Sequence, residues 1–167
     1  MFEPFDLIDA ARRVLTDTDP PPTEAQMRRA ISTAYYGLFH FVLGWAADRL
    51  VGRDRRDSAA YAIVYRGFSH SRMKTVCRDI DRPQLASRYE TALKRSSVSA
   101  LLRDFATGFV ASQQLRQIAD YDPHAAIDRL QVETACDVAN NALLMLDLSD
   151  PNEAIDLLTL MAFGIRD

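Results

Sequence analysis

Residues 115–124 (LRQIADYDPH) hold the side chains of this sequence that are best suited to chemistry. Arg116, Asp120, Tyr121 and His124 lie within nine residues of one another there. An arginine can bind a phosphate through two parallel hydrogen bonds, and a histidine or carboxylate beside it can act as a general base. These residue types predict an anion-binding or catalytic site. In the alternative, Arg116 and Asp120 form an ion pair one helical turn apart and Tyr121 only packs.

An amphipathic helix is expected over residues 100–120, and it would carry these side chains. Its apolar stripe begins with Leu102, Phe105, Ala106 and Phe109. The same stripe continues toward the helix end as Gln113, Arg116, Gln117 and Asp120. The helix should stop before Pro123, because the residue before a proline avoids the helical conformation. Either the helix leaves the core at this end, or a polar cleft opens beside it.

A second long helix is expected over residues 27–50, and it has two stripes. The apolar stripe repeats at helical spacing and consists of Met27, Ile31, Ala34, Leu38, Val42 and Trp45. The opposite stripe consists of Arg29, Thr33, Tyr36 and His40, with Gly37 and Gly44 beside it. Because small residues let another backbone come close, we expect this helix to be contacted on two sides, once by the core and once by something that tolerates polar groups.

Composition limits the fold class and the kinds of partner. A chain of 167 residues with 48% hydrophobic residues is typical of one globular domain. Frequent Ala, Leu and Arg, without alternating β-branched runs, favour an all-α fold. The net charge of -3 means that any nucleic-acid site must be a local patch. The sequence shows neither a run of ~18 apolar residues nor a signal-peptide pattern, so we expect a cytoplasmic protein with no membrane partner.

The helical segments and their breaks predict an antiparallel, up-and-down bundle of four to five helices, with extra short helices, in residues 1–148. Thr23 and Gln26 have the spacing of a capping box for the central helix. Residues 149–167 are expected to form an accessory helix that packs on the same domain or on a partner. The other helices are expected at residues 3–16, 59–66, 69–79, 83–95 and 125–148.

The remaining candidate ligands point to no cofactor. Cys77 and Cys136 lie far apart and are expected to be buried, reduced thiols. The histidines have no metal-type spacing, so we expect neither a metal site nor a cofactor. Arg53, Arg55 and Arg56 lie in one charged loop. That loop is either a solvated connection or a phosphate contact.

Two motifs resemble the HEPN-domain proteins of prokaryotes. Residues 28–40 (RRAISTAYYGLFH) match a helix of the form R-A-x-x-x-A-Y-Y-x-x-F-H. Residues 116–122 (RQIADYD) match the form R-x-x-A-D-Y, and a short SHS segment at residues 69–71 lies between the two motifs. The resemblance covers roughly residues 4–148.

The resemblance implies a bundle of four or five helices that is often a homodimer. Many such proteins are toxins or defence effectors that cleave RNA without a metal, and many pair with a minimal nucleotidyltransferase. Active members carry Arg-x(4–6)-His, and the Arg and His of two subunits face one cleft. Arg116 matches that arginine. Seven residues separate Arg116 from His124, and Tyr121 is the fifth residue after Arg116, so the histidine lies outside the family spacing.

Two functions follow from this resemblance. In the first, the chain is a metal-independent RNA endonuclease of a toxin–antitoxin or defence system, working as a homodimer. Arg116 would hold the scissile phosphate, and His124 or Asp120 would take the proton of the ribose 2′-hydroxyl. In the second, the same surface is a non-catalytic module that binds nucleotide or RNA, or docks a nucleotidyltransferase-type antitoxin. The RNA- or nucleotide-binding residues would be Tyr121, Tyr36, His40 and Arg29.

Overall fold

The computed structural model describes residues 3–16 and 20–165 of the chain. Within these ranges the chain forms eight α-helices and one short 3-10 helix, and no strand. This confirms the all-α helical bundle expected from the sequence. None of the helices in the described ranges carries an apolar run long enough to cross a membrane.

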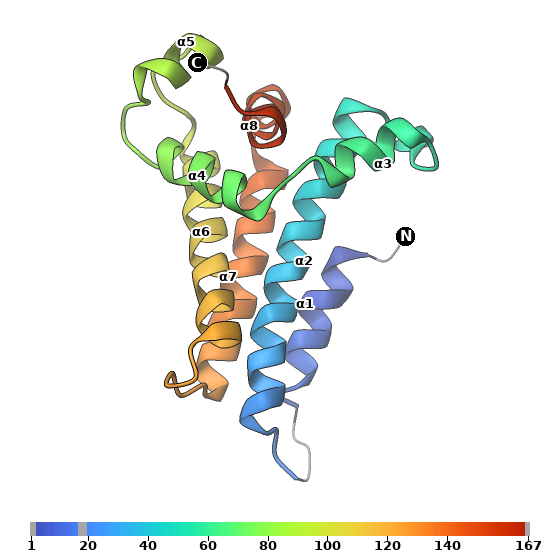
Figure 1. Cartoon of the computed structure of the whole chain (residues 1–167), viewed down its shortest axis with the longest axis vertical. Helices are drawn as coiled ribbons and strands as arrows, with labels where there is room; N and C mark the ends of the chain where they lie inside the picture. Colours follow the sequence, from blue (N-terminus) through green and yellow to red (C-terminus); the bar gives the residue numbers. More distant parts are fainter. Residues whose placement is uncertain (1–2, 17–19, 166–167) are drawn as a thin grey trace.

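Four helices run side by side in alternating directions and form the body of the molecule (Figure 1). They are α1 (Pro4–Arg13), α2 (Glu24–Leu50), α6 (Ala100–Tyr121) and α7 (Arg129–Leu148). Helix α2 packs against each of the other three, so it lies at the centre of the bundle. The largest side chains that are fully buried between the four helices include Tyr35, Leu38, Phe105, Phe109 and Leu143. Both predicted long helices are therefore core elements.

Shorter elements cover one end of the bundle (Figure 1). The segment between α2 and α6 contains η1 (Arg53–Arg55), α3 (Ala59–Arg66), α4 (His70–Ile80) and α5 (Ser87–Leu93). Helix α8 (Pro151–Phe163) packs against α4 and α2, and its buried side chains belong to the same hydrophobic core as the four long helices. Helix α4 also packs on α6, which brings its first residue over the middle of α2.

Local capping explains where the helices begin. Thr23 and Gln26 form the capping box predicted for α2. Asp128 and Gln131 form a second capping box, so α7 begins at Arg129 and the predicted start at residue 125 is wrong. The predicted helix over residues 83–95 is also too long. Helix α5 spans only Ser87–Leu93, because Lys94 adopts a left-handed conformation with φ of 54° and ends it.

The two glycines of α2 have different surroundings. A Cβ atom on Gly37 would lie 2.7 Å from Cγ1 of Ile8 and 3.0 Å from the carbonyl oxygen of Pro4. The missing side chain therefore lets α1 approach the backbone of α2 closely, as the sequence predicted for this side of the helix. A Cβ atom on Gly44 would meet nothing within 4 Å. Gly44 thus faces open space rather than a packed neighbour.

Candidate functional site

Arg116 lies at the centre of a polar and aromatic cluster between α6 and α2. Its side chain is 21% exposed, and its Nε atom is 2.6 Å from Oδ2 of Asp120 in an ion pair one turn further along α6. Its Nη2 atom donates to the hydroxyls of Tyr36 and Tyr121, each at 3.3 Å. The guanidinium carbon lies 5.8 Å and 5.2 Å from the centroids of these two rings. The guanidinium group is thus oriented by a carboxylate and two tyrosines.

Asp120 connects this cluster to α2. One of its carboxylate oxygens accepts a hydrogen bond from the hydroxyl of Ser32, and the other pairs with Arg116. The Asp120 side chain is 26% exposed. The simple i,i+4 ion pair considered from the sequence does form, and it also fixes the direction of the Arg116 side chain.

Arg28 holds the segment that carries Asp120 and Tyr121. Its guanidinium group donates to the backbone carbonyls of Ala119 (3.0 Å), Asp122 (2.9 Å) and Ala125. Three carbonyls at the end of α6 are therefore tied to α2 by one side chain. The sequence analysis did not single out Arg28, because its role depends on backbone atoms that no side-chain pattern reveals.

A histidine from α4 joins the cluster. The His70 ring stacks on Phe39 at a centroid distance of 3.9 Å, and its Nδ1 atom is hydrogen-bonded to the Tyr35 hydroxyl at 2.5 Å. The ring also lies 6.3 Å from the Tyr36 ring, which Arg116 contacts from another direction. Buried Gln113 donates to the backbone carbonyl of His70 at 3.3 Å. The polar end of the α6 stripe thus contacts polar groups of α2 and α4 instead of simply leaving the core.

His40 lies next to this group on α2. Its Nδ1 atom is 2.8 Å from the Tyr65 hydroxyl, and its ring is 6.4 Å from the Tyr36 ring. Burial lowers the pKa of His40. Burial lowers the pKa of His70, and the nearby charges of Arg116 and His40 lower it further. Both imidazoles are therefore neutral at pH 7, and a neutral imidazole can accept a proton.

The structure brings together most of the predicted site residues. Arg116, Asp120, Tyr121 and Tyr36 are in contact, and His40 lies beside Tyr36. The sequence analysis assigned His70 no role in the site, although the SHS segment formed part of the resemblance. Only tertiary packing brings His70 to the site, because α4 begins far from both motifs in the sequence.

Two predicted site residues lie apart from this cluster. His124 is exposed on the turn after α6, where its backbone N–H donates to Asp122 at 2.9 Å. Arg29 is exposed on α2. Within the described ranges, no hydrogen bond or ion pair links either side chain to Arg116.

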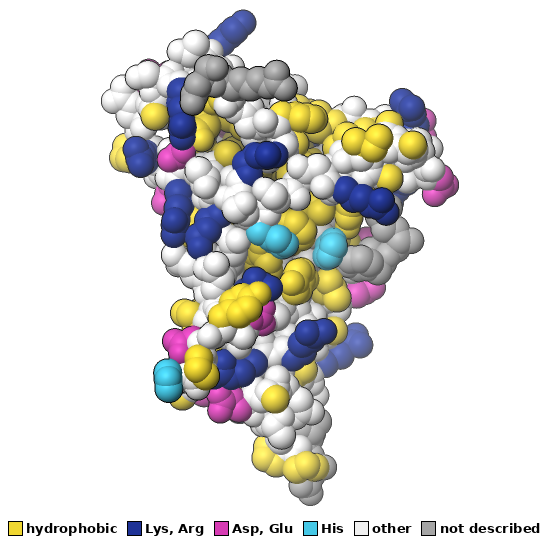
Figure 2. Space-filling view, viewed as in Figure 1, with side chains coloured by type: hydrophobic (Ala, Val, Ile, Leu, Met, Phe, Trp, Pro, Cys, Tyr) yellow, Lys and Arg dark blue, Asp and Glu magenta, His cyan; other side chains and the backbone are white. Residues whose placement is uncertain are grey.

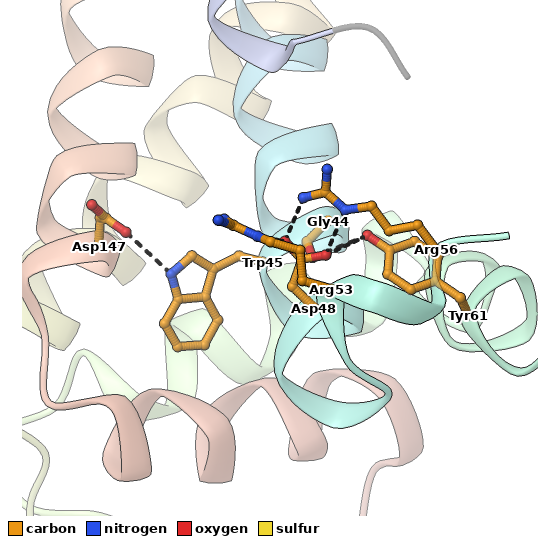
Figure 3. A network of polar contacts seen from close by, with 7 residues as sticks. All are labelled: Gly44, Trp45, Asp48, Arg53, Arg56, Tyr61 and Asp147. Atoms are coloured by element: carbon orange, nitrogen blue, oxygen red, sulfur yellow. Dashed lines mark hydrogen bonds and ion pairs between the residues drawn. The ribbon is translucent and has the colours of Figure 1, made fainter. Parts of the chain in front are cut away.

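The charged loop after α2 forms a second cluster around Asp48 (Figure 3). Arg56 binds the Asp48 carboxylate through two nitrogens, at 2.9 Å and 2.6 Å. Arg53 and the Tyr61 hydroxyl contact the same carboxylate at 3.3 Å and 2.9 Å. Hydrogen bonding from Arg56 lowers the pKa of Asp48 to about 2, although burial opposes this shift. Arg53 and Arg56 therefore anchor the loop to α2.

The surface around the first cluster is mixed in character. Figure 2 shows histidine side chains in the middle of this face, with arginine, acidic and hydrophobic side chains just below them. Tyr121 is 70% exposed and Ile118 is 41% exposed, so apolar surface adjoins the buried part of the cluster. The edge of the cluster at Tyr121 is therefore open to solvent, whereas the Arg116 side chain is 21% exposed.

Comparisons with known proteins identify no relative. No family of known proteins, no curated protein and no solved structure matches this chain.

Proposed function

We propose that this chain is a HEPN-like protein that binds RNA through the Arg116 cluster and cleaves it without a metal. One observation carries the proposal, namely that Arg116 and two neutral histidines lie around one partly buried aromatic ring, that of Tyr36. Arg116 and His70 both contact the Tyr36 ring, and His40 lies one turn along the same helix. Phosphate recognition needs a fixed guanidinium, and proton transfer needs a neutral imidazole near it.

Cleavage would proceed by attack of the substrate's own 2′-hydroxyl. Arg116 binds the non-bridging oxygens of the phosphate and stabilises the charge that develops on them. His70 accepts the proton of the 2′-hydroxyl, the new bond joins O2′ to phosphorus, and the bond from phosphorus to O5′ breaks. The leaving O5′ takes a proton from water, and a 2′,3′-cyclic phosphate remains. The nucleophile is part of the substrate, so positioning supplies much of the catalysis.

This assignment replaces His124 with His70 as the first candidate for the base. In this role, Nδ1 of His70 carries the ring proton and donates it to the Tyr35 hydroxyl oxygen at 2.5 Å, which fixes the ring and makes Nε2 the basic nitrogen. Burial raises the pKa of Tyr35, so its hydroxyl stays protonated at neutral pH. His124 lies on an exposed turn without a fixed contact to Arg116.

A cleavage assay on tRNA and total RNA in the presence of EDTA tests the proposal. We expect the wild-type protein to cleave RNA, and Arg116→Ala to lose most of this activity, on the order of 100-fold or more. His70→Ala should lose a comparable amount and His124→Ala should retain activity. Arg78→Ala, which removes an exposed arginine on α4, is the matched control for loss of one positive charge.

RNA that stays intact with folded wild-type protein would contradict the catalytic proposal. Loss of activity in His124→Ala, with His70→Ala active, would return the role of the base to His124. In either case the thermal stability of each variant must match the wild type closely enough to exclude unfolding.

The second candidate function is a non-catalytic module, and one observation favours it. Arg116 is already paired with Asp120 at 2.6 Å, so part of its capacity for hydrogen bonding is used within the chain. Such a module would bind RNA or nucleotide at the same cluster, or dock a nucleotidyltransferase-type antitoxin there. Binding without cleavage in the assay above would support it.

We also propose a homodimer in which a second copy covers the exposed face around Tyr121. Tyr121 and Ile118 are large exposed apolar side chains beside the cluster, and such patches often mark interfaces. Sedimentation at micromolar concentrations should give a dimer, and Ile118→Asp should give a monomer. A wild-type monomer throughout this range would contradict the dimer.

A further inference from the structure

A cleft of about 310 Å³ lies beside the Arg116 cluster, on the far side of His40. It is formed by the start of α1, the second half of α2, η1 and α3. A cavity of this volume is within the range of small-ligand sites. Four aromatic side chains line it, namely Phe5, Phe41, Trp45 and Tyr65. Such a concentration of rings next to a candidate phosphate site suggests a place for a flat ligand.

The cleft continues from the Arg116 cluster along α2. Tyr36, His40, Gly44 and Asp48 follow one another at intervals of four residues, so each lies about one turn further along the helix and about 40° further around it. Tyr36 belongs to the Arg116 cluster, and His40 and Gly44 line the cleft. Tyr36 and Gly44 are eight positions apart on the helix, which is about 12 Å along the axis. A short stretch of one nucleic-acid strand could therefore reach both places.

Gly44 contributes to the hollow, because no side chain fills the space above it. A Cβ atom at this position would meet nothing within 4 Å. Packing alone therefore does not explain a glycine in the middle of a long helix, where it destabilises the helix relative to alanine.

Arg49 lies over the largely buried Trp45 ring at the edge of the cleft. The Arg49 guanidinium carbon lies 4.1 Å from the centroid of the Trp45 ring. Arg49 is exposed, and it forms no ion pair with any residue in the described ranges. Arginine planes and aromatic rings are the surfaces on which unpaired bases stack.

The charges around the cleft suit a base better than a phosphate. Asp48 contacts both Arg53 and Arg56, as Figure 3 shows, so its negative charge offsets one of their two positive charges. Asp147 accepts from the Trp45 indole at 3.3 Å, and Glu3 also lines the cleft. Carboxylates repel a phosphate but can accept hydrogen bonds from the amino groups of bases.

We propose that the cleft beside Gly44, Trp45 and Arg49 binds a nucleobase of the strand whose phosphate lies at Arg116. This inference rests on the proposed function, because RNA binding at Arg116 supplies the neighbouring strand. The same chemistry would accept the base of a free nucleotide. The base subsite determines which nucleotide occupies this position, whereas Arg116 binds the backbone irrespective of sequence.

Trp45 is the only tryptophan of the chain, so its fluorescence reports on this cleft directly. The test titrates wild type, Gly44→Leu, Gly44→Ala and Arg116→Ala with nucleoside monophosphates, with ribose 5-phosphate as a probe without a base. We expect at least one monophosphate to quench Trp45 fluorescence saturably and ribose 5-phosphate to have no effect. Gly44→Leu should weaken the binding about tenfold or more, since it fills the space where the base would stack. Gly44→Ala should bind within about twofold of wild type, because one methyl group leaves most of the cleft open.

A second titration uses a short single-stranded RNA and separates this inference from the proposed function. Arg116→Ala should bind monophosphates like wild type but bind the RNA more weakly, because a mononucleotide does not span both places. If monophosphates give no saturable quenching, or Gly44→Leu binds them like wild type, the base subsite is overturned whatever the RNA result. If monophosphates bind in the cleft but Arg116→Ala binds RNA like wild type, the cleft is a site for free nucleotides and the proposed RNA site fails.

Discussion

Two clusters along α2 use the same residue types in opposite arrangements. In the Asp48 cluster, a carboxylate lies at the centre and two arginines and a tyrosine converge on it. In the Arg116 cluster, a guanidinium lies at the centre and a carboxylate and two tyrosines surround it. The Asp48 side chain is only 7% exposed, whereas Arg116 and its partners reach solvent.

The difference separates a structural cluster from a candidate binding cluster. Both oxygens of Asp48 are occupied by donors from its own chain, so it has nothing to offer a ligand. Arg116 has five N–H donors, and its contacts within the described ranges leave some of them available to an anion. An ion pair alone therefore does not identify a functional arginine. It is more informative to ask whether a carboxylate or a guanidinium lies at the centre of the network.

Of the charged residues in the two clusters, Asp48→Asn should have the largest effect on stability. The pKa of Asp48 is lowered from 3.8 to about 2. A shift of this size corresponds to about 2 kcal/mol of stability at neutral pH, and we expect the variant to lose about that amount. Asp120→Asn should lose only about 1 kcal/mol or less, because that pair is partly exposed. Urea unfolding of both variants at pH 7 measures the difference.

The Asp48 contribution also has a defined dependence on pH. Because the pKa is lower in the folded state, the stabilisation is present above about 3.8 and is lost as the pH falls toward 2. The stability difference between wild type and Asp48→Asn should shrink over this window. Equal losses for Asp48→Asn and Asp120→Asn at pH 7 would remove the distinction between the two clusters.

Alanine at the two glycines of α2 should have opposite effects. Gly37→Ala places a methyl group 2.7 Å from Ile8, so we expect a loss of about 1–3 kcal/mol as α1 is pushed away. Gly44→Ala meets no atom and should gain up to about 1 kcal/mol from helix propensity. Thermal unfolding of the pair decides the matter, and a loss at Gly44 would show that the space above it is not open.

The smallest expected effect concerns His70 and mild acid. Its pKa in the folded protein lies below the ordinary 6.5, so the unfolded chain takes up the proton first as the pH falls. Stability should therefore decrease below about pH 6.5, and the decrease should be smaller in His70→Gln. The lowered pKa of His40 also makes the protein less stable as the pH falls. If His70→Gln leaves the dependence of stability on pH unchanged, the loss of stability in mild acid comes from groups other than His70.

The sequence predicted the helices well where local signals are strong. Thr23 caps the helix that its position indicated, and the apolar stripes of α2 and α6 are largely buried. The start of α7 was predicted too early because the capping box of Asp128 and Gln131 was not recognised in the sequence. Helical spacing also placed Arg116 and Asp120 one turn apart on α6, as observed.

It was harder to predict from the sequence which residues make up the candidate site. His70 reaches Tyr35 and Phe39 through the packing of α4, a contact between residues far apart in the chain. His124 is close to Arg116 in sequence, but the turn at Asp122-Pro123 leaves it exposed. Proximity along the chain was thus a poor guide beyond the end of the helix, where the backbone direction changes.

The most direct test of the central claim is the salt dependence of RNA binding. A single-stranded 2′-O-methyl RNA lacks the attacking hydroxyl, so binding can be measured at equilibrium for wild type, Arg116→Ala and the control Arg78→Ala. We expect Arg116→Ala to bind more weakly and to reduce the slope of log K against log salt by about 0.7, the value for one phosphate contact on a single strand. Arg78→Ala should match wild type. If Arg116→Ala binds this RNA with the affinity and slope of wild type, the Arg116 cluster is not an RNA-phosphate site.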